Sequence, residues 1–322
     1  MSSVVRRASH AGSWYSSDRT KLNNQLQKWL SEVTVDRQPA RAIISPHAGY
    51  DYSGPCAAFA YKQIDPRHIK RIFVLGPAHY MSLRGKCALS TADFFETPLY
   101  SLSIGRDVYR DLEKTGEFVS LTLDKDEEEH SIEMQMPYIA KMMEGYQGKF
   151  SVVPILVGYL TPEREAVYGQ IFSRYLSNPE NFFVISSDFC HWGKRFQYTY
   201  YDQSKGAIWQ SIQALDETAS FSLYAFTKRE IWHQTPFSIS TYISSYMQRP
   251  AIAVRILKFE RGLSRHAIIW YNDTNDTIKL TNFSLNSRWC WKSRFCFTLQ
   301  GTITCIFLPL LNNWIMFSYS VF

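Results

Sequence analysis

The hydrophobic residues of this chain gather into short continuous runs, separated by longer stretches of mixed composition. Four runs cover residues 41–45, 71–76, 151–158 and 181–187, with the sequences "RAIIS", "RIFVLG", "SVVPILVG" and "NFFVISS". A continuous apolar run suits a strand that is buried on both faces, as in a parallel or mixed sheet covered by helices. We therefore predict one buried strand in each run.

The stretches between the runs have the spacing of amphipathic helices. In residues 17–33, an acidic N-terminal turn precedes a single apolar face made by Leu22, Leu26, Trp29 and Leu30. Similar spacing occurs in residues 131–144, 162–177 and 205–217. This alternation predicts an α/β fold, a layered sheet with helices on both faces.

The alternation fades after Phe226. We therefore predict an α/β domain over residues 1–226 and a separate, divergent tail over residues 227–322. The closing stretch, 295–322, is apolar and long enough for a membrane segment of ~20 residues. Polar side chains interrupt it, and these are costly inside a bilayer. They are Gln300, Asn312 and Asn313, and because of them we expect no membrane association.

Charge adds a second difference between the two parts. The net charge is +6, but residues 227–322 hold 11 Lys and Arg against 4 Asp and Glu, which leaves residues 1–226 at −1. The first part has no basic stripe with interleaved aromatic residues, so we expect no nucleic-acid partner. An acidic run at 124–129 is expected to be a solvated surface or the first turn of a helix.

Composition and the N-terminus bear on the cellular compartment. Hydrophobic residues make up 45% of the chain, which is typical of a packed globular protein. The first residues contain no apolar stretch of the ~7–15 residues that a secretory signal needs, so we expect a cytoplasmic protein. The six cysteines form no CxxC pair, which favours reduced thiols over disulfides.

Polar side chains follow three of the predicted strands. His47 follows the first, His79 the second, and Asp188 with His191 the strand at 181–187. In open α/β sheets, ligand sites collect outside the carboxyl ends of the strands, so these side chains are predicted to converge in one crevice. For each histidine the alternative is a loop residue that caps a neighbouring carbonyl group.

Imidazole nitrogens with a carboxylate are ligands for zinc, iron or copper, and two histidines with one carboxylate are the usual non-haem iron(II) set. A metal with open positions there could polarise a substrate. Asp188 and His191 are three residues apart, which places them on one side of a turn, where the carboxylate can orient the imidazole. Alternatively, Asp188 caps a helix N-terminus.

Other chemistry-bearing residues lie near these motifs. Cys190 could serve as a nucleophile beside a histidine, although a cysteine after a buried strand is more often a small, inert apolar residue. His130 is a possible residue of the pocket, where it is interpreted either as part of a cap or as a partner of Glu133. His10, Trp14 and Tyr15 are expected either to pack over the sheet edge or to form a wall of the same pocket.

Six motifs taken together resemble the Memo family, the mediators of cell motility driven by receptor tyrosine kinases. The resemblance runs from about Val4 to Phe226, in the family's order and spacing. The motifs are "ASHAGSWY", "PHAGYDYSGPCAA", "VLGPAHY", "EEEHSIEMQMPY", "VPILVG" and "SSDFCHWG…YYD".

The resemblance implies a fold like that of the class III extradiol dioxygenases, with a pocket that can hold iron or copper. It identifies His47 and His79 as the metal-facing histidines, and Asp188 and His191 as the remaining acid and base of the pocket. It also implies a cytosolic protein, linked to redox chemistry and to relaying receptor signals to the cytoskeleton. The small-molecule substrate stays unknown.

A second function that the resemblance implies is an adaptor without catalytic activity. Such an adaptor would bind a phosphotyrosine-containing receptor peptide in the same crevice, where the histidines and Arg195 could meet the phosphate. A third interpretation is an α/β domain that no longer catalyses a reaction.

The chain departs from the family pattern near its C-terminus. The family continues with a Cys-Gly…Arg-His-Pro segment whose cysteine joins the metal pocket, whereas this chain has no cysteine between Cys190 and Cys290. We hypothesise that the sequence from about residue 227 onward comes from a shifted reading frame or an alternative exon, and that it is poorly ordered.

Overall fold

The computed structural model describes residues 3–35 and 40–216, together with the backbone of four later strands. The described strands form a ten-stranded mixed sheet in the order β11-β12-β13-β10-β2-β9-β3-β8-β4-β7. Its centre is parallel and consists of β2 (Ala40–Ser45), β9 (Asn181–Ser186), β3 (Arg71–Pro77) and β8 (Ser151–Val157). The four predicted strands are thus confirmed, and they are neighbours.

Shorter or antiparallel strands flank this centre. On one side β4 (Cys87–Leu89) runs antiparallel to β8, and β7 (Phe118–Ser120) pairs parallel with β4. On the other side β10 (Arg265–Asn272) runs antiparallel to β2, followed by β13 (Asn313–Ser320), β12 (Gly301–Leu310) and β11 (Thr281–Leu285). Residue 226, where we predict the domain division, lies outside the described residues, so that division stays a prediction.

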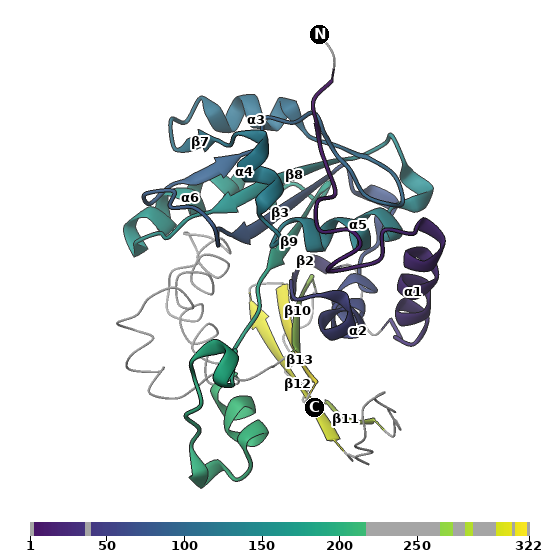
Figure 1. The fold of residues 1–322 in the computed structure, drawn as a ribbon, viewed down its shortest axis with the longest axis vertical. Coiled ribbons are helices and arrows are strands. Elements are labelled where there is room, and N and C mark those ends of the chain that lie inside the picture. The colour runs from purple at the N-terminus through teal and green to yellow at the C-terminus, as the bar shows by residue number, and fades with distance from the viewer. Residues whose placement is uncertain are drawn as a thin grey trace.

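The predicted helices form where the apolar spacing indicates. α1 (Arg19–Ser31) begins at Asp18, whose side chain accepts from the Lys21 amide, and it buries the predicted apolar face. α5 (Met136–Met142), which follows the 3-10 turn η2 (Glu133–Gln135), and α6 (Pro162–Leu176) are the next two. Residues 208–216 are also helical. Figure 1 shows α1 and α5 on one side of the central strands and α6 on the other, which gives the layered α/β arrangement.

Three further helices lie outside the four predicted helical stretches: α2 (Tyr50–Tyr61), α3 (Arg106–Glu113) and α4 (Leu123–Glu128). In α2, eight of twelve residues are buried, so no polar face marks a helical period. Gly54 allows the close contact with α1, since a Cβ atom there would lie 2.3 Å from the Trp29 ring. Packing rather than amphipathicity therefore defines this helix.

A small second sheet attaches the N-terminus to the main body. Its strands are β1 (Val5–Arg6), β5 (Phe94–Phe95) and β6 (Leu102–Ser103). The remaining short turns are the 3-10 segments η1 (Pro66–His68), η3 (Glu144–Tyr146), η4 (Lys194–Phe196) and η5 (Gln203–Lys205). Within the described part of the chain, no helix is both long enough and apolar enough to cross a membrane.

Candidate metal centre

Three adjacent parallel strands end at the same edge of the sheet, and each is followed two residues later by a polar side chain. His47 follows β2, His79 follows β3 and Asp188 follows β9. The His47 and His79 rings lie 5.2 Å apart between centroids. The backbone amide of His47 donates to Asp188 Oδ1 at 2.8 Å. The structure therefore brings these three side chains into one place, because parallel neighbours share a carboxyl edge.

His130 completes the cluster. Its ring lies 4.5 Å from that of His79 and 5.5 Å from that of His47, between centroids. One ring nitrogen from each of the three histidines lies within 4.8 Å of the others. Gly76 in β3 makes the approach possible, since a Cβ atom there would lie 2.7 Å from Ser131 Oγ. His130, a possible pocket residue from its sequence position, thus lies beside the two histidines at the strand ends.

Two of the three rings are held by a contact at Nδ1. For His47 this atom lies 2.8 Å from Ser186 Oγ, and for His79 it lies 2.9 Å from Glu129 Oε1. Nδ1 of His130 is buried and has no hydrogen-bond partner among the described residues; it lies 3.5 Å from Glu129 Oε1. The cluster thus contains a buried nitrogen that the described protein groups do not satisfy.

Burial favours the neutral form of two of the three imidazoles, those of His47 and His130. Burial lowers the pKa of His47, and burial together with the neighbouring His47 and His79 lowers the pKa of His130 to about 3. Burial alone would raise the pKa of Glu129, but hydrogen bonds and the charge of His79 outweigh it and lower that pKa to about 2. Neutral imidazole is the form that binds a metal ion, so the donor set fits a transition metal.

Asp188 lies between two histidines. Its Oδ2 atom is 3.8 Å from Nε2 of His47 and 3.6 Å from Nε2 of His191. Burial opposes ionisation of Asp188, but the charges of His47 and His191 prevail and lower its pKa. Nδ1 of His191 is buried and finds no hydrogen-bond partner in the described part of the chain. The predicted proximity of Asp188 to His191 is therefore observed.

The N-terminal segment reaches the cluster through aromatic contacts. The Trp14 ring lies 4.4 Å from the His130 ring, and the His10 ring lies 6.0 Å from it. Tyr15 points elsewhere and donates from its hydroxyl group to Glu133 Oε1 at 2.7 Å. His10 and Trp14 thus form a wall of the site, and Tyr15 belongs to a neighbouring polar network.

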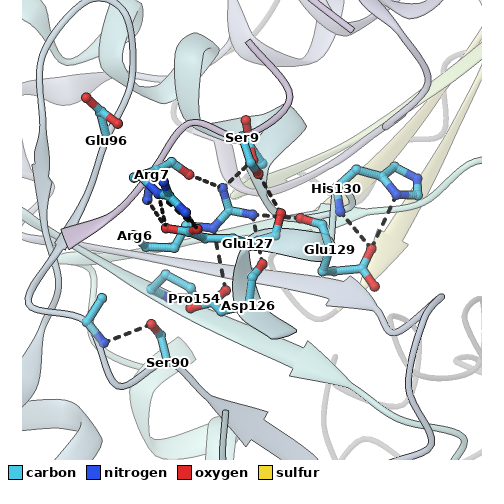
Figure 2. A network of polar contacts seen from close by, with 12 residues as sticks. Arg6, Arg7, Ser9, Ser90, Glu96, Asp126, Glu127, Glu129, His130 and Pro154 are labelled. Atoms are coloured by element: carbon cyan, nitrogen blue, oxygen red, sulfur yellow. Dashed lines mark hydrogen bonds and ion pairs between the residues drawn. The ribbon is translucent and has the colours of Figure 1, made fainter. Parts of the chain in front are cut away.

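That network is centred on Arg6, whose side chain is buried. Arg6 pairs with Glu133. Its Nη2 donates to the backbone carbonyls of Asp126 and Glu129, each at 2.8 Å (Figure 2). Glu133 also contacts Nδ1 of His10 at 2.8 Å. Of the two expectations for the acidic run, the first turn of a helix is observed, since Asp124 and Asp126 lie in the first turn of α4. The other, a solvated surface, is wrong for Asp126, Glu127 and Glu129, which are buried because the N-terminal arginines approach them.

Two further candidates from the sequence are Cys190 and Arg195. Cys190 is buried, which fits its interpretation as a small apolar residue. Arg195 is exposed on η4, just beyond His191. Sequence reasoning did not find Glu129 and Ser186, which contact Nδ1 of His79 and Nδ1 of His47. Both residues stand inside the motifs already quoted, but nothing in their spacing indicates those contacts.

Comparison with known proteins places the chain in a family. A family model described as Memo-like protein matches residues 6–262. The chain belongs to the Memo family. The match extends past Phe226, where the motifs from the sequence analysis end.

Relatives from several animals support the assignment. Protein MEMO1 of Homo sapiens is 50% identical over 243 residues, which are 76% of this chain and 79% of that protein. Protein MEMO1 of Xenopus laevis is 55% identical over 215 residues, 67% of this chain and 72% of that protein. Protein memo-1 homolog of Caenorhabditis elegans is 45% identical over 214 residues, 66% of this chain and 60% of that protein.

Proposed function

We propose that this Memo protein is a cytoplasmic protein that holds a transition-metal ion, iron or copper, between His47, His79 and His130. The observation that carries the proposal is the convergence of three imidazoles, with one ring nitrogen from each within 4.8 Å of the others. This chain has no cysteine between Cys190 and Cys290, so His130 takes the place of the family's cysteine as third donor.

When bound, the metal supplies Lewis acidity and one-electron chemistry. The protein supplies the surroundings. Asp188 orients His191, and His191 Nε2 can take or give a proton beside the cluster. Trp14 covers the His130 ring and limits access of water from that side. This arrangement suits a redox role of the dioxygenase-like kind, linked to the relay of receptor tyrosine kinase signals to the cytoskeleton and to cell migration.

Elemental analysis of the purified full chain tests the proposal. We expect close to one iron or copper ion per chain in the wild type, and its loss in the double variant His47→Ala/His79→Ala and in His130→Ala. The matched control is His68→Ala, because His68 is exposed on η1 and away from the strand ends. A wild-type protein that retains neither metal after reconstitution contradicts the proposal.

The second candidate is an adaptor that binds a phosphotyrosine-containing peptide without catalysis. The observation in its favour is that Lys194 and Arg195 are exposed on η4, directly after the half-buried His191. Binding of one receptor-derived peptide in phosphorylated and unphosphorylated form tests it. Preference for the phosphorylated form that is lost in Arg195→Ala supports the adaptor, and equal affinities rule it out.

A further inference from the structure

The hydrogen bonds around the cluster determine which ring nitrogen of His79 carries the hydrogen. Nδ1 of His79 lies 2.9 Å from Glu129 Oε1, and the two oxygens of that carboxyl group also accept hydrogen bonds from three backbone amides, those of His79, His130 and Ser131. A carboxylate only accepts hydrogen bonds, so Nδ1 is the donor. In a neutral ring the lone pair then lies on Nε2, which is the atom left for a metal.

The same reasoning applies to His47 through a chain of neutral groups. Ser186 Oγ donates its single hydrogen to the backbone carbonyl of Ser131 at 2.6 Å. Gln135 Nε2 donates to the same Oγ at 3.0 Å, and it also donates to the Pro46 carbonyl at 2.9 Å. Toward His47, therefore, the serine oxygen can only accept, so Nδ1 of His47 is again the donor.

We propose that Glu129 and Ser186 are positioning residues that hold His79 and His47 in the Nδ1–H tautomer and present both Nε2 atoms to the metal. The inference rests on the proposed metal site. The hydrogen bond from His79 to Glu129 is the stronger of the two, because an ionised acceptor binds a hydrogen more strongly than a hydroxyl group does. It also raises the basicity of the imidazole ring. His79 is then the more strongly donating ligand of the two.

Glu129 also accepts hydrogen bonds from backbone amides on both sides of the cluster. Its Oε2 accepts from the His79 amide at 2.7 Å, and its Oε1 accepts from the amides of His130 and Ser131, each at 3.0 Å. One buried carboxylate therefore ties the loop after β3 to the turn that carries His130. Removing its charge should weaken two of the three ligands together.

Two neighbouring residues provide matched controls. Glu127 lies two residues before Glu129, is also buried, and pairs with Arg7. Ser187 lies next to Ser186, and its Oγ donates to the Asp188 carbonyl at 3.0 Å. The variants Glu127→Gln and Ser187→Ala remove the same chemical groups as Glu129→Gln and Ser186→Ala, but not the contacts with the Nδ1 atoms of His79 and His47.

The experiment measures tautomers and metal affinity separately in the full chain. The ¹⁵N chemical shifts of labelled histidine in the metal-free protein report which nitrogen carries the hydrogen, with the signals assigned from His47→Ala and His79→Ala. We expect Nδ1–H for both residues in the wild type. We expect a tautomer mixture for His47 in Ser186→Ala, and an upfield shift of the His79 Nδ1 proton in Glu129→Gln. Neither change is expected in the controls.

The second measurement is the affinity for added Cu(II), determined by competition with glycine. We expect a loss of roughly 10–100-fold in Glu129→Gln and a smaller loss in Ser186→Ala. An Nε2–H tautomer for either residue in the wild type overturns the inference whether or not metal binds. Variants that remain folded with wild-type tautomers and wild-type affinity overturn it as well. A wild type that binds no metal but has both Nδ1–H tautomers contradicts the proposed function alone.

Discussion

Two buried polar regions lie side by side in this protein, and they differ in the charges that they gather. Around Arg6, opposite charges meet, and Glu133 takes contacts from Arg6, His10 and Tyr15. Each region keeps buried atoms without a hydrogen-bond partner among the described residues: Arg6 Nε and Asp126 Oδ2 in the first, and His130 Nδ1 in the second. We call the first region the closed network, because its opposite charges stabilise the fold, and the second the open cluster, because its three imidazoles can receive a metal ion.

The strongest test of this difference is to break the closed network. Arg6→Met leaves Glu133 and Asp126 buried without their countercharge, so we expect the free energy of unfolding to fall by about 3–5 kcal/mol. Urea denaturation of the metal-free protein measures it. Arg7→Ala is the control, because Arg7 is exposed and solvent screens its charge, so we expect a much smaller loss. Equal effects of the two variants would contradict the comparison.

Acid should weaken the closed network in a defined range. Burial would raise the pKa of Glu133, but His10 and Arg6 outweigh it and lower the pKa to about 2 from an unfolded value of 4.5. A lowered pKa stabilises the fold above the unfolded value, and that contribution is lost as the pH falls from about 5 to 2. The contribution is on the order of 3 kcal/mol.

Unfolding in urea at a series of pH values between 2 and 6 measures this effect. Glu129 has a lowered pKa too, so the wild-type slope contains both groups. Glu133→Gln should therefore give a shallower dependence on pH, with the remaining slope coming largely from Glu129. A variant slope as steep as that of the wild type would show that Glu133 is not linked to acid stability.

Substitutions in the open cluster should change the metal affinity more than the free energy of unfolding. In His130→Ala we expect metal affinity to fall by more than roughly 100-fold. Loss of a residue that only holds a metal ligand in place costs up to roughly 100-fold. Chelator competition measures the affinity. The unfolding free energy of the metal-free variant should change less than in Arg6→Met, because Glu129, the charged neighbour of His130, keeps its contact with His79. A stability loss as large as that of Arg6→Met would place His130 in the closed network instead.

The smallest predicted effect concerns the packing that joins the cluster to β3. Gly76→Ala places a methyl group against Ser131 Oγ and moves the turn that carries His130. We expect a stability loss of about 1–3 kcal/mol and a weaker metal affinity. Gly145→Ala is the control, because a Cβ atom there meets nothing within 4 Å. Thermal unfolding followed by circular dichroism compares the two variants.

The sequence alone determined the central strands and the residues at their ends. Continuous apolar runs such as 71–76 indicate strands that are buried on both faces, and the sequence shows which polar residue follows each strand. For the same reason His47, His79 and Asp188 could be predicted as one group. Helix α2 could not be predicted, since a helix buried on nearly all sides carries no polar period.

Only the tertiary structure decided the third histidine and the partners of the other two. His130 follows an acidic run that by local pattern belongs on the surface, and it reaches the cluster because Arg6 buries that run and Gly76 lets the turn approach. Glu129 and Ser186 meet the histidines from distances of 50 and 139 residues along the chain. Local spacing describes neighbours along one element, whereas contacts of this kind arise only when separate elements pack together.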